Sequence, residues 1–143
     1  MINRLRFALS LIVTLVVTGC GPDESLTRFQ KQAEEHPNDW MALVNLSRAY
    51  EDRGNYAESI RVTEKLLTLK PEEHWVYAQL AMRYTFNGQF DKATQALEKA
   101  LSLAEKAGPE AVQSTTQLRD GINLFIHATP DERKELKVRM KMK

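Results

Sequence analysis

The chain has 143 residues, enough for one small domain, and it is 43% hydrophobic and 27% charged, which is the composition of a folded protein. Its formal net charge of +1 gives no excess of either sign that would indicate a nucleic-acid partner or an acidic substrate. Its one cysteine, Cys20, excludes an internal disulfide and a metal site built from several cysteines.

The first 19 residues have the layout of a secretory signal. Arg4 and Arg6 precede an uncharged apolar run at residues 8–17, and two small residues follow that run. The run has about ten residues, whereas a transmembrane helix needs roughly 20, so a removable signal is favoured over a spanning anchor. Residues 1–19 are therefore expected to be a signal peptide outside the folded domain.

The signal ends in VTGC, residues 17–20, which resembles the lipobox of bacterial lipoprotein precursors. The resemblance implies that Cys20 carries a covalent lipid, becomes the first mature residue, and begins a short linker at residues 20–22. Gly21 stands where an aspartate typically retains such proteins in the inner membrane, which implies the periplasmic face of an outer membrane. An ordinary signal with an incidental cysteine is the alternative.

Two stretches of the chain, residues 40–71 and 74–105, align with each other at a spacing of 34 residues. In each stretch apolar residues recur at steps of three and four, as on one face of an α-helix, both before and after a central glycine. These glycines, Gly54 and Gly88, provide the left-handed backbone that ends a helix. The pattern predicts two helices joined by a turn in each stretch.

The two stretches are similar to the tetratricopeptide repeat family, through the 34-residue period and the glycine–aromatic sequences GNY (residues 54–56) and GQF (residues 88–90). Small residues at helix-facing positions extend the likeness. The resemblance implies an all-α helical repeat, or α-solenoid, with one repeat at residues 40–73 and a second at residues 74–107.

The flanking residues are expected to complete the stack, because two bare repeats would leave their outer faces uncovered. Residues 23–37 predict a helix that caps the first repeat. Residues 108–143 predict a degenerate third unit in which Gly121 interrupts a helix at 109–128. Thr129 is the predicted N-cap of a basic C-terminal helix. The total is about seven helices.

The sequence contains no familiar motif of a catalytic or metal site. The three histidines, His36, His74 and His127, lie in a loop or at predicted helix ends, and none is spaced from another as metal ligands are. A glycine loop that could hold phosphate is also absent. We therefore predict a binding or scaffolding protein with no catalytic residue, no metal and no cofactor apart from the lipid on Cys20; an enzyme is the alternative.

The resemblance also implies a partner-binding groove lined by the first helix of each repeat. The groove would be mostly apolar, with Arg48 as its main charge, and would suit an amphipathic helix or an apolar strand segment. The alternative is that the protein's own helix at residues 109–128 covers the groove. The predicted groove residues are Met41, Val44, Arg48, Glu51, Trp75, Ala78, Met82 and Phe86.

The predicted function is that of a lipid-anchored scaffold or assembly factor of the bacterial cell envelope. Its expected partners are other envelope proteins, of the pilus, secretion, outer-membrane or cell-wall machinery, and the bilayer through acylated Cys20. The alternative is a structural subunit that forms homodimers and has no peptide ligand. Residues 133–143 carry six basic side chains and one acidic one. This tail is expected either to contact an anionic membrane or to be a solvated, fraying end.

Overall fold

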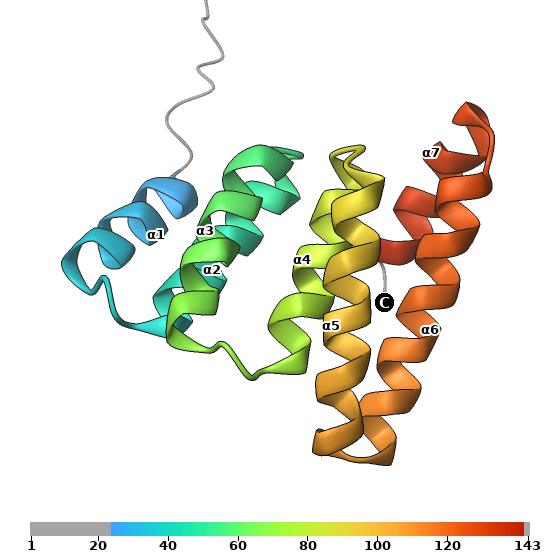
Figure 1. Ribbon diagram of the computed structural model, residues 1–143. Helices are drawn as coiled ribbons and strands as arrows, with labels where there is room; N and C mark the ends of the chain where they lie inside the picture. Colours follow the sequence, from blue (N-terminus) through green and yellow to red (C-terminus); the bar gives the residue numbers. More distant parts are fainter. Residues whose placement is uncertain (1–23, 142–143) are drawn as a thin grey trace, which may run out of the picture.

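The computed structural model describes residues 24–141, and Cys20 and the predicted signal lie outside this range (Figure 1). The described residues form helices packed one after another, which confirms the predicted all-α class and the predicted seven helices. Their bounds are α1 Glu24–Glu35, α2 Trp40–Asp52, α3 Tyr56–Leu69, α4 His74–Phe86, α5 Phe90–Ala107, α6 Pro109–His127 and α7 Pro130–Lys141.

The first pair, α2 and α3, begins and ends where the side chains dictate. The Asp39 carboxylate accepts a hydrogen bond of 2.9 Å from the backbone N–H of Met41, which caps α2. Gly54 then adopts a φ of 72°, in the left-handed region that the sequence predicted for it. The amide oxygen of Asn55 accepts from the N–H of Glu58 at 3.3 Å and caps α3.

The apolar face of this pair forms a core that extends to both neighbouring helices. Leu43, Leu66 and Val76 are almost fully buried at its centre, so α2, α3 and α4 share one cluster. Leu26 and Phe29 of α1 pack against the same cluster from the N-terminal side. The helix α1 therefore covers the N-terminal side of the first pair.

The second pair, α4 and α5, repeats this arrangement. Gly88 has a φ of 76° and turns the chain in the same way as Gly54. The longer α5 ends at Gly108, and Pro109 then occupies the first turn of α6, a position where its missing N–H costs nothing. Ile122 of α6 joins the core of this pair, so α6 covers its C-terminal side.

The last two helices differ in one respect from the sequence prediction. Gly121 does not interrupt α6, which runs without a break from Pro109 to His127. The predicted cap of α7 is present: the N–H and hydroxyl of Thr129 each donate to Glu132 at 2.7 Å, and the Glu132 N–H reaches the Thr129 hydroxyl at 3.4 Å. The two hydrogen bonds that Thr129 donates to the Glu132 carboxylate lower its pKa, and the bond from the backbone N–H has the larger effect.

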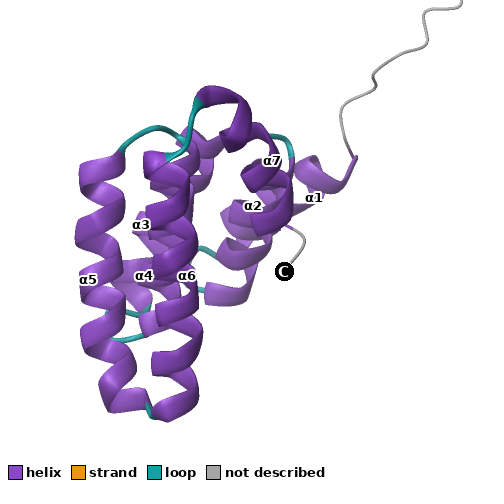
Figure 2. Cartoon of the chain, turned by 90° about the vertical axis from the view of Figure 1, so that its right-hand side faces the viewer, coloured by secondary structure: helices purple, strands orange, loops and turns teal. Residues whose placement is uncertain are grey.

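The course of α7 decides what remains accessible. After α6 the chain turns back, and α7 passes α6 toward α4 instead of extending the stack outward (Figures 1 and 2). Leu136 and Met140 pack against a cluster that contains Phe86 of α4. Among helices of the described range, none is long and apolar enough to cross a membrane.

Candidate partner-binding face

The groove face, the side of the stack formed by α2, α4 and α6, contains every residue predicted to bind a partner. Met41 is 45% exposed, and Arg48 is also exposed to solvent. Trp75, Ala78 and Met82 are half-buried. Val44, Glu51 and Phe86 are buried, so they support the face from beneath.

One half of the groove face is open. A shallow groove of about 250 Å³ runs between α4 and α6, with Trp75, Ala78 and Met82 on one wall and Thr115 and Leu118 on the other. Its polar groups include His74, Gln79 and Ser114. A groove of this composition can bind an apolar side chain of a partner and orient it through a few polar contacts.

Aromatic residues extend the open half toward α2. The ring centres of Trp40 and Trp75 lie 6.0 Å apart, and Nζ of Lys70 lies 5.2 Å from the Trp40 ring centre. The Trp75 indole N–H donates to the Glu73 carboxylate at 3.1 Å, which fixes the ring. Trp40 is nevertheless partly exposed beside exposed Met41. The groove face therefore presents a fixed aromatic pair that is partly open to solvent.

The other half of the groove face is covered. Phe86 contacts the rings of Tyr56 and Phe125 at centre-to-centre distances of 5.5 and 5.6 Å. We call Tyr56, Phe86 and Phe125 the aromatic seat. Leu136 and Met140 of α7 pack on this seat beside Met82. Self-covering was predicted for residues 109–128, and in the structure α7 provides much of it.

Two cations of α7 lie over the same aromatic rings. Nζ of Lys137 is 4.4 Å from the ring centre of Tyr56 and 5.5 Å from that of Phe86. The Arg133 guanidinium lies 5.8 Å from the Phe125 ring centre and donates to the carbonyl oxygens of Phe125 and Ile126 at 3.0 and 2.7 Å. Lys137 and Arg133 are attracted by the negative partial charge of the ring faces, and Arg133 is also attracted by the carbonyl oxygens at the C-terminal end of α6.

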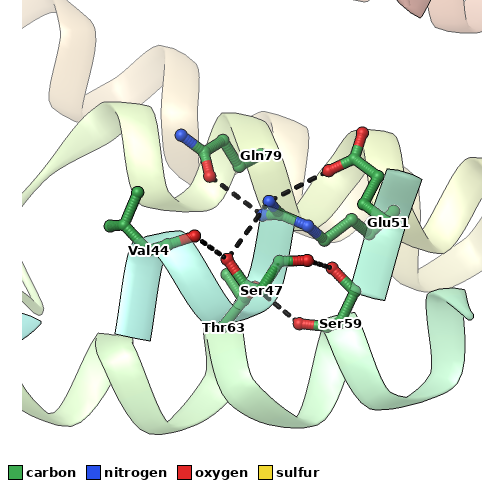
Figure 3. A network of polar contacts seen from close by, with 7 residues as sticks. Val44, Ser47, Glu51, Ser59, Thr63 and Gln79 are labelled. Atoms are coloured by element: carbon green, nitrogen blue, oxygen red, sulfur yellow. Dashed lines mark hydrogen bonds and ion pairs between the residues drawn. The ribbon is translucent and has the colours of Figure 1, made fainter. Parts of the chain in front are cut away.

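Between the two repeats lies a buried polar network (Figure 3). Arg83 of α4 is 1% exposed and forms an ion pair of 3.0 Å with Glu51 of α2. The guanidinium also donates to Gln79 at 3.0 Å and to the Ser47 hydroxyl at 3.4 Å. The Ser59 hydroxyl donates to the Ser47 carbonyl at 2.7 Å, which joins α3 to the network. Burial lowers the pKa of Arg83, and Glu51 opposes that shift.

A second polar contact crosses the same junction. The Tyr84 hydroxyl of α4 donates to the Glu64 carboxylate of α3 at 2.6 Å. Burial and this hydrogen bond both raise the pKa of Tyr84, because each disfavours the phenolate. The sequence predicted neither the buried ion pair of Arg83 nor the hydrogen bond between Tyr84 and Glu64. The available signal was Arg83 itself, a charged residue aligned with Ala49 of the first repeat.

The histidines lie where the sequence placed them, His36 after α1, His74 at the start of α4 and His127 at the end of α6. Within residues 24–141, no group of three or more His, Cys, Asp or Glu side chains is arranged to hold a metal ion. The groove face offers apolar and aromatic surface with few polar groups, which is chemistry suited to binding.

Comparison with protein families agrees with this geometry. Two sequence models described as tetratricopeptide repeat match residues 42–73 and residues 76–106. The first match covers most of α2 and all of α3, and the second covers most of α4 and of α5. A comparison with curated proteins gives no match.

Proposed function

We propose that this chain, in which residues 42–106 form two tetratricopeptide repeats, is a protein-interaction scaffold of the bacterial cell envelope. Repeats of this type make it a candidate for binding proteins, and a non-catalytic role fits them. In our proposal a partner segment binds in the open half of the groove face, while a lipid on Cys20 holds the protein at the membrane. The partners would be other envelope proteins.

The observation that carries this proposal is the exposed aromatic surface of the open half. Trp40 leaves 36% of its surface in solvent against Trp75, which lines a groove of about 250 Å³, and Met41, the next residue of α2, is 45% exposed. Rigid aromatic side chains that border a pocket are the usual anchors of protein interfaces. An apolar residue of a partner helix or strand would fill the groove and cover the two tryptophans.

The start of α1 determines how close an anchored chain would lie to the membrane. Because α1 begins at Glu24, four residue steps separate it from Cys20, and four steps span at most about 14 Å. An acylated Cys20 would hold the N-terminal end of the stack close to the lipid headgroups. With Gly21 after the cysteine, we place the protein at the periplasmic face of an outer membrane.

Site-specific photocrosslinking in the native envelope tests the binding site. A photoreactive amino acid at Met41 should give a crosslink to another protein, and Trp75→Ala should abolish it. The matched control carries the photoreactive residue at Glu98, which is exposed on α5 away from the groove face. Equal crosslinking from both positions would contradict the groove. A crosslink only to a second copy of this chain would instead favour the self-assembling structural subunit.

Replacement of the anchoring cysteine tests the location independently. Cys20→Ser should leave an unprocessed precursor that carries no lipid, detected by metabolic labelling with a radioactive fatty acid. Processed and membrane-bound Cys20→Ser protein would contradict the lipid anchor and leave the binding proposal to be decided by the crosslinks.

A further inference from the structure

The contacts of α7 with the aromatic seat indicate which kind of helix the seat can bind. On the aromatic seat α7 places two apolar side chains four residues apart, Leu136 and Met140, which lie on one face of the helix. Between them Lys137 directs its ammonium group at the rings of Tyr56 and Phe86. The seat thus accepts a helix with an apolar pair at positions i and i+4 and a cation at i+1.

We propose that the aromatic seat is a second binding site, specific for a basic amphipathic helix, and that α7 fills it in the unbound protein. A partner helix with the pattern of Leu136, Lys137 and Met140 displaces α7 and takes its place. The inference rests on the proposed use of the groove face for binding, and it adds a site and a regulatory step to that use.

The packing of α7 makes displacement feasible. No residue of α7 between Pro130 and Met140 is buried, although α2 to α5 each contain six or more buried residues. A hollow of about 410 Å³ remains between α6 and α7, lined by Leu118, Gly121, Leu136 and Met140 among others. Close packing is the usual source of helix docking energy, so α7 is held more weakly than the repeats are.

The hydrogen bonds and the ion pair described for α7 lie in its N-terminal half. The hydrogen bonds of Arg133 and the cap at Thr129 both belong to the first turn of α7. The ion pair of Lys134 is internal to α7, because its partner is Asp131 at 3.0 Å. Among the described side chains of α7 beyond its first turn, Leu136, Lys137 and Met140 are the ones that contact the aromatic seat.

The same residues favour a protein helix over a lipid surface as the competing ligand. Leu136 and Met140 face the protein, so Val138, 58% exposed, is the apolar residue that α7 presents to solvent. Exposed Lys134 and Arg139 of α7 would be attracted to anionic lipid, but exposed Asp131, Glu132 and Glu135 on the same helix oppose that attraction. Binding to lipid would show as vesicle association and is an outcome that the test below detects.

The test uses a fluorescent peptide with the sequence of residues 128–143, titrated with the full chain in a nonionic detergent and, separately, with vesicles that contain anionic lipid. The tethered α7 competes at an effective concentration near the millimolar range, so the wild-type chain should bind the peptide weakly. Lys137→Glu in the chain weakens the internal contact and should tighten peptide binding about fivefold. Leu136→Asp, a second way to release α7, should have the same effect.

The matched control is Lys134→Glu, which makes the same charge change at a side chain that is 79% exposed and pairs with Asp131 of α7 itself. It should leave peptide affinity within about twofold of wild type. A peptide that carries Lys137→Glu should bind none of these chains tightly.

Equal affinity for all chains, or binding of the Lys137→Glu peptide, would overturn the proposal. Binding of α7 peptide to anionic vesicles but to no protein chain would overturn it in favour of a lipid role. If the Met41 crosslink persists under either result, the second site alone is wrong. If that crosslink is also absent, the proposed function is wrong as well.

Discussion

The junction between the two repeats and the docking of α7 both join helices, but their cations are buried to different degrees. Both join helices across a mixed polar and aromatic contact. At the repeat junction the guanidinium of Arg83 is enclosed and bound by Glu51, Gln79 and Ser47. At α7 the cation of Lys137 rests on ring faces at the edge of the protein, with part of its side chain in solvent.

The difference teaches which contacts can be exchanged. If Arg83 loses its partner, an uncompensated charge remains in the core, so the contacts of the repeat junction cannot be exchanged without a large loss of stability. A half-exposed cation that leaves an aromatic ring returns to water at little cost. The repeats are therefore suited to be a fixed frame, and α7 is suited to be the movable part.

The largest effect should follow from breaking the buried pair. Glu51→Ala leaves the Arg83 charge without its carboxylate and should lower the free energy of unfolding by about 3 kcal/mol. The double variant Glu51→Leu with Arg83→Met should be more stable than Glu51→Ala, because it removes both charges. Glu35→Ala, which removes one partner of the exposed pair with Lys31, should cost less than about 0.5 kcal/mol.

Urea unfolding followed by circular dichroism measures these values. If Glu51→Ala and Glu35→Ala cost the same, the repeat junction does not depend on its buried charges, and the contrast with α7 disappears.

The second polar contact of the repeat junction predicts a dependence on alkaline pH. Tyr84→Phe removes the hydrogen bond to Glu64 and should cost about 1 kcal/mol at neutral pH. Because folding raises the pKa of Tyr84, this advantage of wild type should be complete below pH 10, near the ordinary tyrosine pKa, and should decline above it. Unfolding titrations at pH 8 and pH 11 compare the two chains. An advantage that grows with pH would contradict the assignment.

Two glycines give effects of opposite sign. Gly121 lies within α6, and a methyl group there would meet Cε of Met140 at 3.8 Å, an ordinary contact. Gly121→Ala should therefore raise stability by up to about 1 kcal/mol through helix propensity. Gly54→Ala should lower stability by about 1 kcal/mol, because the φ of 72° is strained for alanine. Thermal unfolding distinguishes them, and a destabilising Gly121→Ala would mean that α7 packs more tightly than its hollow indicates.

The smallest effect on stability is expected at α7 itself. Lys137→Glu should change the free energy of unfolding of the repeats by less than about 1 kcal/mol, since the two cation–π contacts that it removes belong to one partly exposed cation. Chemical denaturation provides the value, and a loss as large as that of Glu51→Ala would make α7 part of the fixed frame.

The sequence predicted the frame well because the frame is periodic. Gly54 and Gly88 fixed the turns, the three- and four-residue steps fixed the buried faces, and Thr129 fixed the start of α7. Arg83 was not predicted, because periodicity indicates that a position faces inward but not that a charge there will find Glu51. The direction of α7 was also not predicted: Leu136, Val138 and Met140 are apolar at alternate positions, and the aromatic seat that selects Leu136 and Met140 is built by distant residues.

Hydrogen–deuterium exchange of the full chain, read by mass spectrometry, tests the contrast between frame and movable helix most directly. The amides of α7 beyond its first turn should open with a free energy at least about 2 kcal/mol below that of the amides of α2 and α4, under conditions where the repeats stay folded. The peptide of residues 128–143, added in excess, should make α7 exchange faster still. Protection of α7 equal to that of α4, unchanged by the peptide, would contradict the account.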